Sequence, residues 1–273
     1  RVAMVVCDVV AVSAPVVDEA RRLIQKSTGL GADQVMISAT HNHSGPLMTG
    51  RGSRDSAYGG NLEILQKYMA TLPEKIAESV RLANTNLAPV RVSAARAEES
   101  SVSFNRRFLM KDGTYGWNPG KLNPNIVRPA GPIDPEVAVV YFDSPDGKPQ
   151  VTHVNHALHV AVASGRKFTA DYPGVLARLL GAVKGSDMLT VFSIGCAGNV
   201  NHIDVQSARP QGGPTEAARI GTILAARVLQ TYEKLEPVAA DALQFRREIV
   251  RLPLPPIRPG DVERARAFAD RAG

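Results

Sequence analysis

The order of apolar and amphipathic segments constrains the fold most strongly. Short apolar runs typical of buried strands alternate with longer segments whose apolar residues recur at helical spacing. We expect strands at residues 2–10, 34–40, 90–97, 137–142, 150–158, 188–194 and 241–252, and helices at 15–25, 62–83, 173–182, 214–235 and from 259 onward. Strands alternating with helices predict a layered α/β domain. Because 137–142 and 150–158 flank a short turn, as in a hairpin, we expect a mixed β-sheet core flanked by helices.

Composition and charge exclude several classes of protein. The 273 residues are 44% hydrophobic and 21% charged, which is typical of a globular protein with a sizeable core. The net charge of +6 permits attraction to anionic partners, but aromatic residues make up only 5% and the basic residues are dispersed. No run approaches the roughly 18 apolar residues of a membrane helix. We therefore expect no nucleic-acid partner and no transmembrane span.

Both ends of the sequence fall at secondary structure elements. Arg1 leads directly into an apolar strand, and the last expected helix runs up to Gly273. We therefore expect this chain to be a portion of a longer protein. The two cysteines, Cys7 and Cys196, are too few for a disulfide framework, and each lies in an apolar stretch, so we expect buried free thiols.

Two histidines, His41 and His43, follow the apolar run 34–40 in the stretch Thr-His-Asn-His-Ser-Gly-Pro. Side chains alternate along a strand, so two imidazoles two residues apart would project to the same face and could meet one metal ion. The following Ser-Gly-Pro ends the strand and turns the chain. The Gly-rich loop at 50–60 is long enough to act as a functional flap, and residues 111–135 are expected to be irregular.

All six histidines lie on, at the end of, or just beyond expected strands. His153, His156 and His159 lie on one strand, and His202 follows another. Such convergence predicts a metal site built from neutral imidazoles, and Zn(II) is the usual metal for such ligands in a hydrolase. Along the strand, His153 and His159 share a face and His156 points the other way. We interpret His153 and His156 as structural sheet histidines.

Four stretches, taken in order, resemble a known family. The segment 39–46 is similar to the THTHSGP motif of the neutral (alkaline, non-lysosomal) ceramidases, with Asn42 in place of the middle threonine. Residues 105–107 are similar to the family's NRS segment. Residues 155–174 are similar to its second histidine segment and the turn that follows. Residues 192–201 correspond to the segment with a GDVSPN core. Together the ordered motifs are specific, although each alone is weak.

The resemblance implies a single metallohydrolase-like catalytic domain over residues 1–273, acting in lipid and sphingolipid metabolism as a zinc-dependent amidase. By motif matching, His41 and His159 are the metal ligands, His43 lies near the scissile carbonyl, and Arg106 holds substrate or oxyanion. The family's remaining ligands, a glutamate and a tyrosine, have no convincing match before Gly273. We expect them to lie outside this sequence.

One departure limits the resemblance. Asn201 stands where the ceramidases have the serine of GDVSPN, and Asn199 stands at their aspartate. An amide cannot act as a nucleophile, so a serine-based acyl-enzyme is excluded at that position. A mechanism based on metal-activated water remains, with Asn199 or Asn201 as a hydrogen-bond donor to substrate. We therefore expect a remote relative that cleaves an N-acyl, ceramide-like amide or an ester.

Three aspartates have alternative roles. Asp171 is expected to cap the helix that begins at Pro173, in preference to a place beside the metal. Asp8 and Asp204 end apolar runs, and either could orient an imidazole.

Several other functions remain open. An amidohydrolase barrel also has a His-x-His strand end, but it requires regular βα units. A metallo-β-lactamase requires His-x-His-x-Asp-His, where this chain has Gly45 and Pro46. A non-catalytic binding relative would retain the fold without activity. For the enzyme, we expect a small-molecule or lipid-like acyl substrate, contact with a membrane surface, and a secreted or periplasmic location implied by the resemblance alone.

Overall fold

The computed structural model describes residues 1–46, 62–165, 167–239, 243, 246, 248–254 and 256–272. The expected flap at 50–60 lies outside these residues. The chain divides into two compact units, Arg1–Leu243 and Gln244–Gly273. The second unit contains helix α6, Asp261–Ala272, as expected from the sequence. Among the described helices, none combines the length and the apolar composition needed to cross a membrane.

The larger sheet in the first unit is mixed, as the sequence predicted. Its order is β10-β9-β8-β3-β12, in which β10 and β9 are parallel and the other neighbours are antiparallel. The five strands are β10 (Leu189–Ile194), β9 (Pro149–His156), β8 (Glu136–Asp143), β3 (Arg91–Glu98) and β12 (Glu236–Pro237). β8 and β9 form the expected hairpin.

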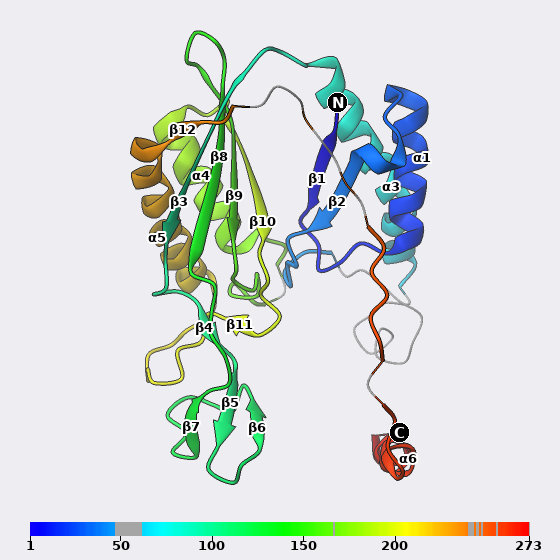
Figure 1. Ribbon diagram of the computed structural model, residues 1–273, viewed down its shortest axis with the longest axis vertical. Coiled ribbons are helices and arrows are strands. Elements are labelled where there is room, and N and C mark those ends of the chain that lie inside the picture. The colour runs from blue at the N-terminus through cyan, green and yellow to red at the C-terminus, as the bar shows by residue number, and fades with distance from the viewer. Residues whose placement is uncertain are drawn as a thin grey trace. The chain divides into compact units, whose positions relative to one another are not determined.

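Helices α4 (Asp171–Lys184) and α5 (Pro214–Thr231) lie beside this sheet (Figure 1). Their apolar faces form one core with the sheet because leucine, isoleucine and valine recur at helical spacing in α4 and α5 and at alternate positions in β8 and β9. Tyr172, which is fully buried, packs edge to face against Phe192 and donates a hydrogen bond from its hydroxyl group to Leu158 O at 2.7 Å. This contact attaches α4 to the chain segment just beyond β9.

A second, two-stranded sheet pairs β1 (Ala3–Cys7) with β2 (Val35–Ala39) in parallel. Helices α1 (Ala14–Thr28) and α3 (Glu63–Thr85) pack against each other and against this sheet, which gives a separate core (Figure 1). A short 3₁₀ helix, Ala32–Gln34, leads into β2. The expected helices at 15–25 and 62–83 are therefore present, with ends shifted by one to three residues.

Residues 111–135 are not irregular throughout. They contain β6 (Tyr115–Trp117) and β7 (Ile126–Pro129), which both pair with β5 (Arg107–Met110) in a small antiparallel sheet. We call the small sheet of β5, β6 and β7 the β5–β6 lobe. β4 (Phe104–Asn105), just before β5, pairs with β11 (Val200–Asn201). The expectation of an irregular insert was wrong because strands of three or four residues are too short to give a recognisable alternation.

Two further expectations were wrong. The described residues within 241–252 form no strand; the edge strand is instead the short β12, which follows a 3₁₀ turn at Tyr232–Lys234. An alternating pattern cannot form a strand without a neighbouring edge to pair with. Both cysteines are free, but Cys196 is exposed and Cys7 is only partly buried. Cys196 lies in the turn after β10, where an apolar neighbourhood in sequence does not imply burial.

Candidate metal centre

The carboxyl ends of β1, β2 and β9 are joined by backbone hydrogen bonds. Beyond β2, Thr40 N donates to Cys7 O at 3.0 Å, and Asn42 N donates to Val9 O at 3.1 Å. His43 N donates to Val160 O at 2.9 Å, which links this turn to the segment after β9. The carboxyl ends of neighbouring strands are where open α/β sheets commonly place their ligands.

The turn that carries His41 and His43 is not a continuation of the strand. β2 ends at Ala39, and His41 adopts a left-handed backbone conformation with φ of 61°. Strand alternation therefore does not explain why the two imidazoles face each other. A residue with φ above 0° reverses the chain direction locally, and this reversal brings the two rings to a centroid separation of 4.9 Å.

Two residues hold this turn in place. Asn42 is buried, donates from Nδ2 to Thr169 O at 2.7 Å, and accepts from Ser44 N at 2.8 Å. Gly45 packs so closely that a Cβ atom there would lie 2.4 Å from Asp8 O. Any larger residue at position 45 would therefore displace the turn. Asn42, where the ceramidase motif has threonine, is a structural residue here.

Three imidazoles come together at this point: His41, His43 and His159. The ring centroids of His41 and His159 are 4.7 Å apart, and those of His43 and His159 are 5.5 Å apart. One ring nitrogen of each residue lies within 4.8 Å of the others, so the three could hold a metal ion. Among the described residues, no cysteine or carboxylate joins this group. The glutamate and tyrosine ligands that the resemblance implies were expected outside this sequence.

Backbone carbonyl groups fix the orientation of two of the three rings. Nδ1 of His41 lies 2.7 Å from Val10 O, and Nδ1 of His159 lies 2.9 Å from Ala197 O. A carbonyl oxygen can only accept, so each Nδ1 carries the proton and each Nε2 retains a lone pair. This is the usual arrangement of metal-binding histidines, whose second ring nitrogen is held by a hydrogen-bond acceptor.

The environment favours the neutral form of His159 and of His43. Burial lowers the pKa of His159 to about 4, and the nearby charges of Arg106, His41 and His43 act in the same direction. Burial also lowers the pKa of His43, with smaller contributions from His41 and Arg106. A neutral imidazole is the form that binds a metal ion. Of the three, His43 is the most exposed, and its ring makes no hydrogen bond within the described part of the chain.

His159 lies three residues beyond the end of β9, so the alternation of side chains along a strand does not predict its direction. The structural interpretation of His156 and His153 agrees with their contacts. His156 is fully buried, with Nδ1 donating to Glu136 O at 2.9 Å and Nε2 at 3.0 Å from Ser103 Oγ. His153 Nε2 lies 2.8 Å from Ser193 Oγ. Neither ring joins the cluster.

Asp171 lies in the first turn of α4, which begins two residues earlier than expected. Its Oδ2 accepts from Val162 N and Ala163 N, both at 2.8 Å, and its Oδ1 accepts from Tyr172 N at 2.6 Å. The carboxylate therefore holds the segment that follows His159 against the helix. It supports the cluster through the backbone. The expected capping role was wrong, because the N-cap residue of α4 is Ala170, without a side-chain cap hydrogen bond.

Within the part of the chain that the structure describes, Asp8 and Asp204 form no hydrogen bond with an imidazole. Asp8 Oδ1 accepts from Thr40 Oγ1 at 3.1 Å, and Asp204 Oδ1 accepts from Gln206 N at 2.9 Å. The ring of His202, two residues before Asp204 in the sequence, donates from Nε2 to Gln211 O at 2.7 Å. The residues that orient the imidazoles are therefore backbone carbonyls, which no sequence pattern identifies.

Arg106 is held from two sides. Its Nε and Nη2 atoms donate to Gly198 O at 3.2 and 2.8 Å, and its guanidinium group lies 4.1 Å from the centroid of the Trp117 ring. Stacking on the ring is a favourable cation–π contact. Because its charge lowers the pKa of both His43 and His159, the guanidinium lies within electrostatic reach of the cluster. Trp117 is the only tryptophan of the sequence, and its position beside Arg106 depends on the pairing of β5 with β6.

Asn201 does not have a free amide. Its Nδ2 donates to Asn118 Oδ1 at 2.9 Å, and its Oδ1 accepts from Ile203 N at 3.0 Å. The side chain is nearly buried and connects β11 to the β5–β6 lobe. Of the two amides considered as donors to substrate, Asn199 has no side-chain hydrogen bond among the described residues and is exposed.

Comparison with solved structures identifies the fold. The chain is similar to the neutral ceramidase from Pseudomonas aeruginosa, with a TM-score of 0.61, 21% identity, and coverage of 82% of this chain and 35% of that one. It is similar to a ceramidase complexed with C2, with a TM-score of 0.61, 22% identity, and coverage of 80% of this chain and 34% of that one. The chain thus spans about a third of the length of these structures. No family model matches, and no curated protein matches. The resemblance that the sequence motifs indicated is confirmed for the fold.

Proposed function

We propose that this chain carries the histidine ligands and the catalytic histidine of a zinc-dependent hydrolase that cleaves an N-acyl amide, ceramide-like, or an ester. The observation that supports this most directly is the group His41, His43 and His159, in which two rings have Nδ1 hydrogen-bonded to backbone carbonyls. The fold shared with ceramidases favours an acyl-transfer reaction to water over other metal-dependent chemistry.

The residues present fit a zinc ion. Neutral imidazole nitrogens are common zinc ligands, and catalytic zinc sites typically use three protein ligands and leave one position open. We assign His41 and His159 as ligands because their Nε2 lone pairs are fixed by the contacts of Nδ1. When bound, zinc would supply a water molecule of lowered pKa and would polarise the scissile carbonyl group.

His43 and Arg106 perform the remaining steps in this proposal. The ring of His43 makes no hydrogen bond among the described residues, and burial lowers its pKa, which keeps the ring neutral and able to accept a proton; in this proposal it takes the proton from the attacking water and delivers it to the leaving group. Arg106 stays fully charged because guanidinium groups ionise far above neutral pH, and it stabilises the oxyanion that forms on the substrate. Gly198 O and Trp117 hold its position. Asn201 is assigned no contact with substrate in this proposal, because its Nδ2 already donates to Asn118 Oδ1 and its Oδ1 already accepts from Ile203 N.

The test is metal analysis combined with a substrate panel. We expect purified protein to bind zinc stoichiometrically and to hydrolyse at least one of three substrate types: short-chain esters, N-acyl amino acids or ceramide. Chelation and the change His41→Ala should each abolish both properties. Absence of zinc binding together with unchanged behaviour of His41→Ala would favour a non-catalytic binding relative. Zinc binding without hydrolysis of any substrate would reject the hydrolase and retain the metal site.

We also propose that the substrate is a lipid-like acyl compound reached at a membrane surface, and that the protein is secreted or periplasmic. Both statements depend on the sequence resemblance. Hydrolysis of ceramide presented in vesicles, at a rate that rises with vesicle concentration, would support the first. Cell fractionation tests the second, and a purely cytoplasmic distribution would contradict it.

A further inference from the structure

A small cavity lies between the β5–β6 lobe and the chain segment that includes β11. Its volume is about 260 Å³, and its lining residues are Arg106, Phe108, Asn118, Gly120, Lys121, Asn201, Ile203 and Val205. We call it the Arg106 cavity. Pockets that enclose a whole drug-sized ligand have volumes of roughly 300–1,000 Å³. The Arg106 cavity therefore has room for one end of a substrate and not for a whole acyl compound.

The charge that lines this cavity is positive. Among the described residues, its charged lining residues are Arg106 and Lys121, and no carboxylate lines it. Arg106 donates to Gly198 O, and Lys121 Nζ donates to Ala208 O at 3.1 Å and to Arg209 O at 2.7 Å. A backbone carbonyl group carries no net charge, so these contacts position the two cations without neutralising them.

Hydrogen-bond donors remain available in the cavity. Arg106 contacts Gly198 O through Nε and Nη2, and its Nη1 makes no hydrogen bond in the described part of the chain. Asn118 Oδ1 accepts from Asn201 Nδ2, which leaves Asn118 Nδ2 as a donor without a partner among the same residues. Asp204, adjacent in sequence to two lining residues, directs its Oδ1 to Gln206 N. Positive charge and N–H donors together favour a carboxylate ligand, because charge-assisted hydrogen bonds are the stronger kind.

The Arg106 cavity is linked to the histidine cluster through two consecutive residues. Ala197 O accepts from Nδ1 of His159, and Gly198 O, the next carbonyl group along the chain, accepts from Arg106. The charge of Arg106 also lowers the pKa of His43. Arg106 thus belongs both to the cavity and to the surroundings of the cluster. A substrate whose amide bond lies at the cluster can reach the cavity with a group a few atoms away.

We propose that the Arg106 cavity binds a carboxylate on the amine side of the scissile amide, so that the preferred substrates are N-acyl amino acids and not neutral ceramides. Lys121 is then a specificity-determining residue, because it brings a second positive charge to the cavity. A ceramide carries hydroxyl groups at this end and no charge to offset the two cations. The inference rests on the proposed hydrolase function and names the substrate class of the same site.

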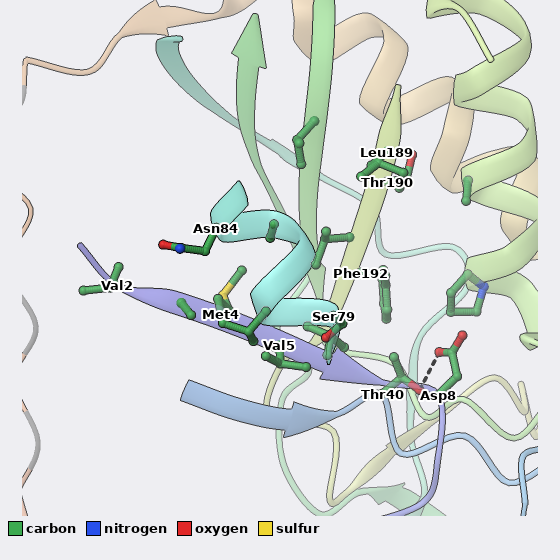
Figure 2. A pocket seen from close by; sticks show the side chains of 18 of the residues that line it. Val2, Met4, Val5, Asp8, Thr40, Ser79, Asn84, Leu189, Thr190 and Phe192 are labelled. Carbon is green, nitrogen blue, oxygen red and sulfur yellow. Dashed lines mark hydrogen bonds between the residues drawn. The ribbon is translucent and has the colours of Figure 1, made fainter. Parts of the chain in front are cut away.

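A larger cavity, of about 670 Å³, lies beside β1 and β10 and differs in charge (Figure 2). Among the described residues, its charged lining residues are Arg1 and Asp8, which have opposite signs, and most of its other lining residues are apolar. Figure 2 shows Asp8 beside Thr40, whose Oγ1 donates to Asp8 Oδ1 at 3.1 Å. A carboxylate would gain no net attraction there, so we assign the carboxylate to the Arg106 cavity.

The test compares two soluble amides that differ in the group at issue. N-octanoylglycine has a carboxylate, and N-octanoylethanolamine has a hydroxymethyl group in its place. We expect the zinc-loaded protein to hydrolyse N-octanoylglycine with a kcat/KM at least about tenfold higher, as expected for a hydrogen bond to a charged group. Equal kcat/KM values would overturn the inference while leaving the hydrolase proposal intact.

A pair of lysine substitutions localises the preference. Lys121→Gln removes a charge from the cavity, whereas Lys111→Gln removes one from an exposed position of the same lobe outside the lining. We expect Lys121→Gln to lower kcat/KM for N-octanoylglycine by about tenfold and to leave N-octanoylethanolamine unaffected, which also shows that the variant is folded. Lys111→Gln should change neither value. Equal losses in the two variants would contradict the assignment, because the cause would then be the charge of the whole lobe.

Binding measured without turnover separates this inference from the hydrolase proposal. Titration calorimetry on the metal-free protein should show tighter binding of N-octanoylglycine than of N-octanoylethanolamine, and this difference should shrink in Lys121→Gln. That result without hydrolysis of either compound by the zinc-loaded protein would reject the hydrolase and retain the carboxylate site. Equal affinities for the two compounds, unchanged by Lys121→Gln, would overturn the inference whether or not the protein hydrolyses them.

Discussion

His156 and His159 lie three residues apart and are both buried, with exposed fractions of 0% and 6%, yet their environments differ. Both ring nitrogens of His156 have protein partners, namely Glu136 O and Ser103 Oγ. Among the described residues, only Nδ1 of His159 has one, so its other nitrogen remains available beside His41 and His43. Burial therefore does not distinguish the two; His159 has a ring nitrogen close to those of His41 and His43, so that the three could hold a metal ion, and His156 does not belong to this group.

The largest effect is expected from His159→Ala. Removing only the group that hydrogen-bonds a histidine ligand lowers metal affinity by roughly 10- to 100-fold. Because His159→Ala removes the ligand itself, zinc affinity should fall by at least about 100-fold and hydrolysis should disappear. Titration calorimetry with zinc measures the affinity, and circular dichroism confirms folding. Retention of wild-type zinc affinity would show that the comparison with His156 is mistaken.

His43→Gln tests whether His43 acts as the catalytic base and not as a metal ligand. We expect hydrolysis to fall by about 10²- to 10⁴-fold, the usual contribution of a general acid–base group, while zinc affinity stays close to that of the wild type. Steady-state kinetics and zinc titration on the same preparation measure the two properties. If zinc affinity instead falls as far as in His159→Ala, His43 is a third ligand.

His156→Ala should affect stability and leave the metal site intact. Removing a fully buried ring leaves a cavity and deprives Ser103 Oγ and Glu136 O of their partner, at a cost of about 2–4 kcal/mol. Urea denaturation of the metal-free proteins measures the loss. If His156→Ala kept its stability but lost its zinc affinity, His156 and not His159 would be the metal ligand.

The smallest effect is a pH dependence of stability. Burial lowers the pKa of His156 from its ordinary value of 6.5, so the unfolded state binds a proton at a higher pH than the folded state. The stability that His156 provides is therefore complete above about pH 6.5 and declines as the pH falls toward its folded pKa. Urea midpoints of metal-free wild type and His156→Asn measure this from about pH 8 to about pH 5. The wild type should show the steeper decline, and equal slopes would contradict a lowered pKa of His156.

Much of the fold could be predicted from local pattern. The strands at 137–142 and 188–194 and the helices at 15–25 and 62–83 have apolar residues at the spacing of their secondary structure, and all four are present. The short strands β6 and β7 and the edge strand β12 could not be predicted, because each depends on pairing with a strand distant in sequence. The same dependence applies to the described residues within 241–252, which form no strand although their sequence pattern predicted one.

For the candidate site, the sequence by itself supplied the residue types. The order of His41, His43 and His159 in motifs similar to those of ceramidases identified the three imidazoles that the structure brings together. It also excluded a serine nucleophile at Asn201, since an amide cannot attack a carbonyl group.

Only the tertiary structure decided how these residues meet and which atoms remain free. The positive φ of His41, and not strand alternation, turns its ring toward His43. Val10 O and Ala197 O set the tautomers of His41 and His159, and Asn118 Oδ1 occupies the amide of Asn201. Hydrogen bonds between residues far apart in the sequence depend on how the chain packs, and backbone carbonyls are identical at every position. For this reason the sequence could identify the imidazoles but not the groups that orient them.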